Sequence, residues 1–466
     1  QNLYELEAKE GLGPVFQYGH LQSYTGSVSG GTAATRYYIS ADWEDNVGIV
    51  DYNWSKRLST RVNLSVMPRD NLTLSVNTGF VRGDMSLMQQ ASGWDIWSNL
   101  LWGSPRQRDN DNPLRGFLRA TPEEIAKIEA TSEYNRFTTG ITGEFRPTSW
   151  LMQRLVLGID NTEEQNVLFF PRDPKGADHF FGAASLGQKD VSRPRTTIVT
   201  LDYAGTASVD LTPDLRSSTS IGFQYYKRQR HTIQAYGERF PAPGLNSVAA
   251  GAVRTGSEDF TENATLGLYV QEQLDWRNRA FLTVALRGDD NSAFGAEYDA
   301  ALYPKLSAAW VLHEEPFWNV GFVNALRLRA AWGAAGQQPG SYDAIRLYSA
   351  VTGFGDGPAL TPGSYGNPTL KPERSEELEL GFDAGLWNDR LQVVFTRYNR
   401  VTKDAILNRQ VPPSLGFSGS QVVNLGKTKN WGYELGINGL LLARRNLALD
   451  LGLNFIGIDV VAAGDD

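Results

Sequence analysis

The segment LALDLGLNF at residues 447–455 alternates strictly between large apolar residues and small or polar ones. Successive side chains of a β-strand point to opposite faces of the sheet, so this alternation predicts one apolar face and one polar face. The apolar face carries Leu447, Leu449, Leu451, Leu453 and Phe455, and the polar face carries Ala448, Asp450, Gly452 and Asn454. Residues 447–455 are therefore predicted to form a strand that separates two different environments.

The same alternation recurs along nearly the whole chain, in segments of about ten residues. Examples lie at residues 36–44, 60–66, 71–80, 137–145, 215–225 and 378–384. Counting all such segments predicts about sixteen strands, which is more than an ordinary sandwich holds. The fold class is therefore expected to be all-β. A soluble protein of two stacked sheets would also alternate, so the connections between the strands have to decide.

Short turns and long polar loops largely alternate along the chain. Short turns are predicted at residues 67–70, 146–149, 211–214, 388–389 and 444–446, with an intermediate connection at 313–324. Long loops are predicted at about 82–133, 164–193, 230–261 and 336–374. Such loops are uncommon in compact soluble domains, whereas outer-membrane barrels combine tight periplasmic turns with long extracellular loops. We therefore expect a transmembrane antiparallel β-barrel with extracellular long loops and with lipid against its outer face.

The composition is compatible with a barrel and excludes several other classes. The 466 residues carry a formal net charge of −8, with 41% hydrophobic residues and no cysteine. This apolar content argues against disorder, the acidic excess against a nucleic-acid binder, and the missing cysteine against disulfides within this sequence. No apolar run of about 18 residues is present, which excludes helical membrane spans but not barrel strands.

Tryptophan residues are placed at or near predicted strand ends, where the amphipathic rings of membrane barrels form girdles at the lipid–water interfaces. The set consists of Trp150, Trp276, Trp310, Trp332, Trp387 and Trp431. Each ring alone could equally be a core aromatic, but the set favours the membrane interpretation.

The order of short and long connections places both chain ends on the long-loop side. An intact barrel of about sixteen strands would have its ends on the short-turn side. The chain also stops at Gly464, Asp465 and Asp466, without an aromatic final strand. It is therefore expected to be an internal piece of a larger barrel.

Several short motifs recur in a defined order along the chain: residues 27–31, 35–40, 46–50 and 57–63, and later residues 326–333 with 336–339. They resemble early and later barrel strands of the SusC/RagA branch of TonB-dependent transporters, in the same order. The most specific is GNPTLKPERSEELELG at residues 366–381, followed by residues 398–400, 404–406, 424–426 and 430–434. The resemblance covers most of the chain from about Ser27 onward.

This resemblance implies a barrel of 22 strands in the outer membrane of a Gram-negative bacterium. It further implies an N-terminal plug domain, a segment that engages the TonB complex, and a SusD-like surface lipoprotein as partner. By comparison with the family, the chain is expected to lack the plug, the first strand and about five final strands. Energised uptake is then an implication of the family and not of these residues.

Motifs for catalysis or metal binding are not evident. The histidines His20, His179, His231 and His313 have no paired metal-ligand spacing. Residues 109–112 begin like a calcium loop, but Pro113 and Leu114 break the pattern. No nucleophile elbow, phosphate loop or dinucleotide fingerprint is found. We therefore expect neither an enzyme nor a cofactor.

One long loop contains three tryptophans, Trp94, Trp97 and Trp102, which are the candidate substrate-binding residues. Aromatic faces stack on sugar rings, so these residues could bind a glycan. Packing between loops, or contact with a partner protein, is the more common role of such residues. In the same loop Thr121, Pro122 and Glu124 predict a capped helix that runs to about Thr131.

The leading functional hypothesis is TonB-powered import of a large nutrient, such as a glycan or a peptide. Two alternatives stay open: a structural or scaffolding barrel without transport, and a receptor for ferric siderophores or cobalamin. A plug and a TonB-binding segment in the full-length gene, with a SusD-like neighbour, would favour import. A barrel without a plug would favour the scaffold.

Overall fold

The alternating segments form long antiparallel strands in the computed structural model, which describes residues 2–88, 95–108, 112–174, 186–298, 300–417 and 419–463. Sixteen strands are hydrogen-bonded into one sheet in chain order, which confirms the predicted all-β class and the predicted strand number. They are β1 (His20–Gly31), β2 (Thr35–Val47), β3 (Trp54–Arg69), β4 (Leu72–Ser86), β5 (Glu129–Thr148), β6 (Leu151–Phe170), β7 (Gln188–Thr212), β8 (Leu215–Glu238), β9 (Val253–Trp276), β10 (Ala280–Asn291), β11 (Ala301–Val311), β12 (Val323–Gln337), β15 (Glu373–Leu386), β16 (Leu391–Lys403), β19 (Lys427–Arg444) and β20 (Leu447–Ala463).

Two hairpins lie outside this sheet, in connections between its strands. One pairs β13 (Leu347–Thr352) with β14 (Pro358–Ser364), and the other pairs β17 (Ile406–Gln410) with β18 (Ser420–Asn424). The helices are short: α1 (Leu3–Lys9), α2 (Ile96–Leu101), α3 (Pro122–Ile125), η1 (Pro105–Gln107), η3 (Val248–Ala250), η4 (Leu312–Glu314), η5 (Phe354–Asp356) and η6 (Pro413–Leu415). In the described residues, no helix has the length and apolar character needed to cross a membrane.

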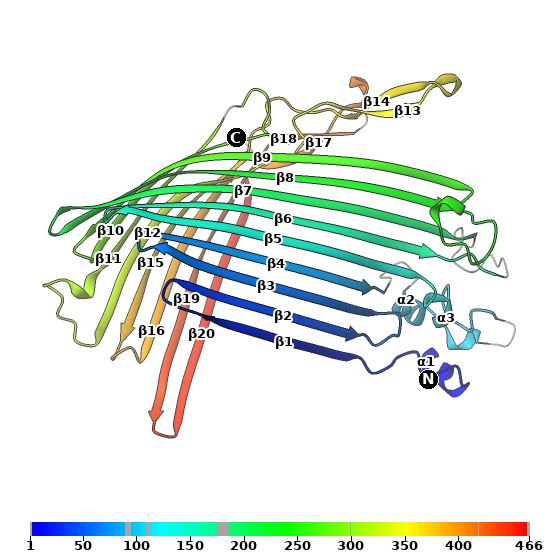
Figure 1. Ribbon diagram of the computed structural model, residues 1–466, viewed down its shortest axis with the longest axis horizontal. Coiled ribbons are helices and arrows are strands. Elements are labelled where there is room, and N and C mark those ends of the chain that lie inside the picture. Colours follow the sequence, from blue (N-terminus) through cyan, green and yellow to red (C-terminus); the bar gives the residue numbers. More distant parts are fainter. Residues whose placement is uncertain are drawn as a thin grey trace. The chain divides into compact units, whose positions relative to one another are not determined.

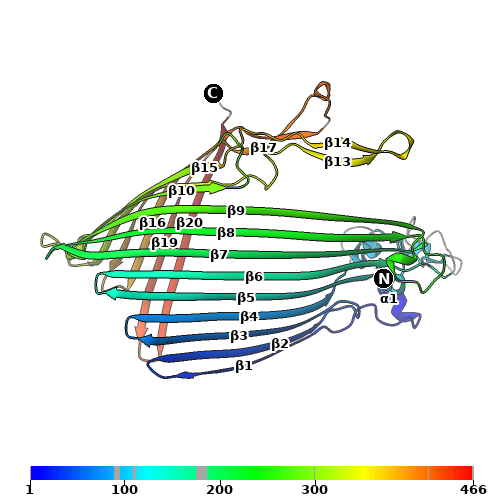
Figure 2. The same ribbon diagram turned by 45° about the horizontal axis from the view of Figure 1, so that its top comes forward.

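The chain divides into two compact units. Unit 1 comprises Gln1–Gly143, Leu157–Val199 and Arg228–Glu262, and unit 2 comprises Glu144–Val156, Thr200–Lys227 and Asn263–Asp466. In unit 1, strands β1 to β4 run side by side in chain order (Figures 1 and 2). In unit 2, strands β10, β11, β12, β15, β16, β19 and β20 do the same.

Short turns connect the strands at one end of the sheet. Four of these turns are formed by residues 213–214, 277–279, 387–390 and 445–446. Arg277 and Asn278 adopt φ of 54° and 55°, the left-handed backbone that matches a tight hairpin turn to the twist of the strands. The Asn278 N–H also donates to the Asp275 carboxylate at 2.8 Å. The predicted turn at 67–70 is shorter than expected, because β3 continues to Arg69 through an irregularity between Val66 and Arg69.

The strands extend further into the long connections than the amphipathic pattern indicates. The connections span residues 87–128, 171–187, 239–252 and 338–372, inside the predicted loops 82–133, 164–193, 230–261 and 336–374. Polar residues on both faces remove the alternation, but the backbone ladder does not need apolar side chains. Arg195 of β7, for example, pairs with Glu163 of β6 at 3.3 Å. A further connection at 404–426, which contains β17 and β18, was not among the predicted long loops.

The apolar core lies at the long-connection end and not inside a pair of stacked sheets. Fully buried apolar side chains of the described residues include Leu3, Ile96, Ile125, Phe240 and Leu370. By contrast, the strand residues that a sheet sandwich would bury are exposed. Ile39, Leu64, Leu74 and Leu449 are 44%, 39%, 41% and 53% exposed, respectively.

Candidate functional site

The apolar face of the sheet in unit 2 is exposed along its length. On β10, Leu282, Val284 and Leu286 are 40%, 49% and 45% exposed. Leu282 and Leu286 stand opposite Leu274 and Val270 of β9 in the pairing register. An apolar surface of this extent needs an apolar environment, because soluble monomers rarely expose one. The lipid-facing band of a membrane barrel provides that environment.

Aromatic rings border this face at the short-turn end. Trp276 ends β9 and Trp310 lies one residue before the end of β11, and both pair with Ala280 of β10. Trp150 and Trp387 lie in or beside turns at the same end of their strands. The other two predicted girdle residues lie inside strands: Trp332 in β12 and Trp431 in β19. The expected placement at strand ends is thus found for four of the six rings.

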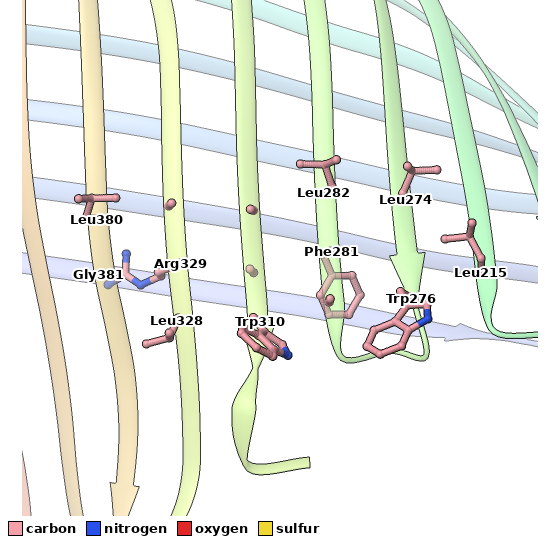
Figure 3. A pocket seen from close by; sticks show the side chains of 14 residues that line it. Leu215, Leu274, Trp276, Phe281, Leu282, Trp310, Leu328, Arg329, Leu380 and Gly381 are labelled. Atoms are coloured by element: carbon pink, nitrogen blue, oxygen red, sulfur yellow. The ribbon is translucent and has the colours of Figure 1, made fainter. Parts of the chain in front are cut away.

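A hollow of about 710 Å³ lies against this part of the sheet. Figure 3 shows leucine side chains from neighbouring strands in one row and the indoles of Trp276 and Trp310 below them. Ala280, Ala308 and Ala330 also line the hollow, and their small side chains explain the depression between larger neighbours. Its apolar lining offers dispersion contacts and few hydrogen bonds, as suits a lipid chain.

Glu272 interrupts the apolar face. Its place in the alternation of β9 is that of an apolar residue, opposite Val284 of β10. The carboxylate accepts hydrogen bonds from the hydroxyl groups of Ser217 and Thr219 on β8. These donors compensate part of the cost of a charge among apolar side chains. The sequence pattern does not reveal this residue, because a single break does not disturb the period-two alternation.

The polar face in unit 1 carries charges that are paired across strands. Arg57 of β3 binds Glu44 of β2 and lies 3.8 Å from Asp42. Arg136 of β5 contacts Asp160 of β6 at 2.5 Å. A polar hollow of about 840 Å³ lies against this wall, lined by serine, threonine and asparagine side chains besides the charged ones. Such a surface fits contact with water and not with lipid.

The polar face in unit 2 has the same construction. Arg327 and Arg329 of β12 both reach Asp383 of β15, at 2.5 and 3.3 Å. Glu377 of β15 binds Arg400 of β16. In the pairing register the two arginines share one face of β12, and Glu377 and Glu379 share one face of β15.

An ordered loop domain covers the strand ends of unit 1. It is formed by residues 2–19, 48–53, 87–88, 95–108 and 112–128, and its core contains Leu3, Tyr4, Val50, Ile96 and Phe117. Helices α1, α2 and α3 lie together at this end of β1 to β4 (Figure 1). Segments that are distant in sequence thus share one small core.

A buried ion-pair network fixes α1 to the long connection of the loop domain. The Glu7 side chain is 1% exposed and contacts Arg108 at 2.5 Å and Arg115 at 2.8 Å. Arg108 also binds Glu10 at 2.5 Å, and Arg115 binds Glu123 at 2.7 Å. The hydrogen bond from Arg108 holds the pKa of Glu10 below its usual value. A buried carboxylate needs this many donors to compensate its desolvation.

Two of the three candidate binding residues lie on the surface of the loop domain, and Trp94 lies outside the described residues. Trp97 of α2 is 45% exposed and stacks on Phe16 at 5.2 Å, so one face of its indole is already covered. Trp102 follows α2 and is 74% exposed, next to Leu101 at 76%. Both tryptophans therefore expose aromatic surface.

The predicted helix at 121–131 is correct at its start and wrong in its length. Thr121 and Glu124 form a capping box, in which the Thr121 N–H donates to the Glu124 carboxylate at 2.8 Å. The helix ends at Ile125, and β5 begins at Glu129. Residues 129–131, which were predicted as the end of the helix, therefore belong to strand β5.

A third hollow, of about 440 Å³, lies in the loop domain and was not predicted. Gln17, Asp51, Tyr52, Ile96 and Glu123 are among its lining residues. The Tyr52 hydroxyl is buried and has no hydrogen-bond partner among the described residues. Burial, together with the nearby carboxylates of Asp51 and Asp95, raises the pKa of Tyr52 to about 12.

The described histidines have individual polar contacts. His231 lies 2.6 Å from the Glu258 carboxylate, His313 accepts from the Leu326 N–H at 3.0 Å, and His20 contacts Gln22, while His179 is outside the described residues. The described part of the chain contains no group of three or more His, Cys, Asp and Glu that could hold a metal ion. Asp109 to Asp111 of the calcium-like segment also lie outside the described residues.

A family model described as "TonB dependent receptor-like, beta-barrel" matches residues 15–463. The chain belongs to this family. The family consists of receptors and transporters and not of enzymes. The sheet of this chain, with one apolar and one polar face, is the barrel that the family model describes. A TonB-dependent receptor of Formosa agariphila is 28% identical over 474 residues, which cover 95% of this chain and 46% of that protein. The TonB-dependent receptor SusC of Bacteroides thetaiotaomicron is 23% identical, over 94% of this chain and 47% of SusC.

Solved structures of TonB-dependent receptors share the fold. The RagAB peptide transporter superposes with a TM-score of 0.84 at 19% identity, over 95% of this chain and 51% of that one. The siderophore receptor PirA from Pseudomonas aeruginosa gives a TM-score of 0.55 at 15% identity, over 96% of this chain and 64% of that one. The expected resemblance to the SusC/RagA branch is thereby confirmed. The chain spans about half the length of the curated relatives SusC and the Formosa agariphila receptor.

Proposed function

We propose that this chain is the barrel part of a transporter in the outer membrane of a Gram-negative bacterium. The whole protein imports a nutrient such as a glycan or a peptide, with energy supplied through the TonB complex and with a SusD-like lipoprotein as partner. The observation that carries the proposal is the two-faced sheet. Its apolar face exposes Ile39 and Val284, and its polar face holds paired charges such as Arg136 and Asp160.

The energetic cost of the reverse arrangement supports this orientation. A charged residue on the lipid face of a barrel costs about 2–4 kcal/mol at the bilayer centre, whereas the same residue on a water-filled face costs little. Arg57, Arg136, Arg327 and Arg400 all have carboxylate partners on the polar face. A sheet with this distribution is stable with lipid on one side and water on the other.

The long connections are proposed to be extracellular and to receive the cargo and the partner. Support comes from the loop domain, whose buried core and ion pairs give a rigid surface instead of a flexible loop. Trp97 and Trp102 present aromatic surface there. SusC and the RagAB peptide transporter are among the similar proteins, and they motivate both the cargo classes and a partner at this surface.

Location is tested by fractionating cells that produce the full-length protein containing this chain. We expect the protein in the outer-membrane fraction, with a heat-modifiable mobility on electrophoresis that reports a folded barrel. Recovery of the folded protein in the soluble fraction without detergent would reject the proposal.

Transport is tested with a strain that lacks the gene, supplied with single glycans or peptide mixtures as carbon source. We expect a growth defect on one cargo class, restored by the intact gene and abolished again by a protonophore. A defect confined to iron limitation would replace the proposal by a siderophore receptor. A defect in envelope structure without any uptake defect would replace it by a scaffold.

The role of the tryptophans is tested by the double change Trp97→Ala and Trp102→Ala. We expect weaker binding of the cargo or of the lipoprotein to the full-length protein. Leu118→Ala is the matched control, because Leu118 is 39% exposed in the same long connection. Equal binding by the double variant and the wild type would remove these residues from the proposed site.

A further inference from the structure

The hairpin of β13 and β14 stands outside the sixteen-stranded sheet as a separate two-stranded sheet. All six residues of β13 are exposed, and Leu360 of β14 is 70% exposed. The turn carries Phe354, which is fully exposed. Both views show the hairpin extending away from the strands of unit 2 (Figures 1 and 2). An isolated two-stranded hairpin is marginally stable in water, so an exposed one invites a third strand.

The hydrogen-bond phase of the hairpin shows which groups point outward. The Gly353 N–H donates to the Gly357 carbonyl at 2.7 Å, so this pair is a hydrogen-bonded pair. Hydrogen-bonded and non-hydrogen-bonded pairs alternate along an antiparallel ladder. In the register of the hairpin, the N–H and C=O groups of Tyr348, Ala350 and Thr352 therefore point to the outer edge of β13. No hydrogen bond from these outward positions to another described segment is found.

The outer edge of β14 is closed by its sequence. Pro358 and Pro362 pair with Thr352 and Tyr348, so they occupy outward-pointing positions and lack the N–H that a further strand would need. Only Leu360 between them offers an outward N–H. Proline on an exposed edge is a common protection against unwanted pairing. The hairpin therefore has one protected edge and one open edge.

The root of the hairpin is held in place, so the open edge has a defined position. The guanidinium of Arg346 lies 4.6 Å from the ring centre of Tyr365, and the Tyr365 ring lies 6.1 Å from that of Phe417. The Asn367 side chain donates to the Val422 carbonyl of β18 at 3.0 Å. These contacts join the two ends of the hairpin to each other and tie the end after β14 to the neighbouring connection, while the strands stay uncovered.

We propose that the outer edge of β13 captures cargo peptides by adding them as a third, extended strand; this inference rests on the proposed import function and specifies its cargo. Outward N–H and C=O groups repeat every second residue, about 6.7 Å apart. An extended peptide backbone has the same repeat, whereas the hydroxyl groups of a glycan do not. The six residues of β13 match a peptide segment of about six residues, or about 20 Å.

The side chains around the edge define the preferred peptide. Residues 347–364 contain a single charged residue, Asp356, in the turn. Tyr348 and Leu360 lie on one face of the hairpin, and Leu347 and Val351 lie on the other. Side chains of an added strand would continue these two faces. The site therefore selects uncharged peptides with β-branched or aromatic residues, chiefly through backbone hydrogen bonds.

The test measures binding of a fluorescein-labelled hexapeptide of alternating valine and threonine to the full-length protein in detergent. Ala350→Pro removes the central outward N–H of β13, and the backbone of the hairpin tolerates it as it tolerates Pro358. We expect the dissociation constant to rise at least about tenfold. Leu360→Pro is the matched control, because it changes the protected edge in the same way, and it should leave the affinity unchanged.

A fully N-methylated version of the peptide cannot add to a sheet edge, and we expect it not to bind. Equal affinity of Ala350→Pro and Leu360→Pro, or retained binding of the methylated peptide, would overturn the proposal. Hydrogen exchange of residues 347–364 in both variants verifies that the hairpin still forms. Absence of peptide binding together with intact uptake of a glycan would reject this inference and leave the import function standing.

Discussion

Removal of the Glu7 carboxylate is expected to open the loop domain. The side chain is 1% exposed and accepts hydrogen bonds from Arg108 at 2.5 Å and from two nitrogens of Arg115 at 3.0 and 2.8 Å. Without it, the guanidinium of Arg108, which is 8% exposed, loses a buried partner. Breaking a buried pair by removing one member costs about 3–5 kcal/mol. Glu7→Gln keeps the size of the side chain, so the change isolates the charge.

Hydrogen exchange measured by mass spectrometry on the full-length protein is the assay. A loss of this size accelerates exchange through local opening by roughly two to three and a half orders of magnitude in α1 and in residues 95–108 and 112–121, because about 1.4 kcal/mol corresponds to a factor of ten. The barrel strands should exchange as before. Glu10→Gln is the control: Glu10 also binds Arg108, but its side chain is 51% exposed, so little change is expected. Equal exchange in both variants would refute the idea that the ion-pair network holds the domain together.

Three further predictions concern packing, the membrane face and a buried phenol. Gly103→Ala places a Cβ 2.6 Å from a backbone carbonyl oxygen and should destabilise the loop domain by about 1–3 kcal/mol in the same exchange assay; Gly26→Ala, which meets nothing within 4 Å, should not. Val284→Arg on the apolar face should lower the free energy of unfolding by about 2–4 kcal/mol, measured by denaturant unfolding of the barrel in vesicles. Thr283→Arg on the other face should lower it much less. Equal losses in the two variants would contradict the assigned faces. Tyr52 should titrate near pH 12 in a difference ultraviolet titration against Tyr52→Phe, because burial and two nearby carboxylates raise its pKa. The stability that the neutral phenol contributes is present below the ordinary phenol pKa of about 10 and is lost as pH rises through 12. A titration near pH 10 would contradict the burial of the hydroxyl group.

The strands were predictable because their signal is local. The alternation at residues 447–455 needs only the geometry of one strand, and the structure places Leu449 and Asp450 on opposite faces as expected. The strand ends were not predictable by the same means. At the polar end of β7, Arg195 and Glu163 pair on strands whose side chains no longer distinguish lipid from water. Backbone pairing continues there without any pattern in the sequence.

The loop domain and the hairpins depend on contacts that no single segment reveals. Glu7 meets Arg115 across more than one hundred residues, and neither residue lies in a pattern that identifies its partner. The short strand β14 carries two prolines, which argue against a strand when the sequence is considered alone. Their position at a protected edge becomes clear only when the register is known. Trp97 and Trp102 are exposed in the long connection, and their role as binding residues stays a prediction.

The cross-strand ion pairs have a consequence for any solute that moves along the polar face. Arg136 pairs with Asp160, Arg57 lies beside two carboxylates, and Arg327 and Arg329 share one, so a passing molecule meets charges that already have partners of the opposite sign. An anionic or cationic cargo would then gain little by stopping there, and added salt would change its passage only weakly. In the proposed import function, such a wall would discriminate little between charged and uncharged nutrients, and selection would fall to the parts of the protein that bind them first.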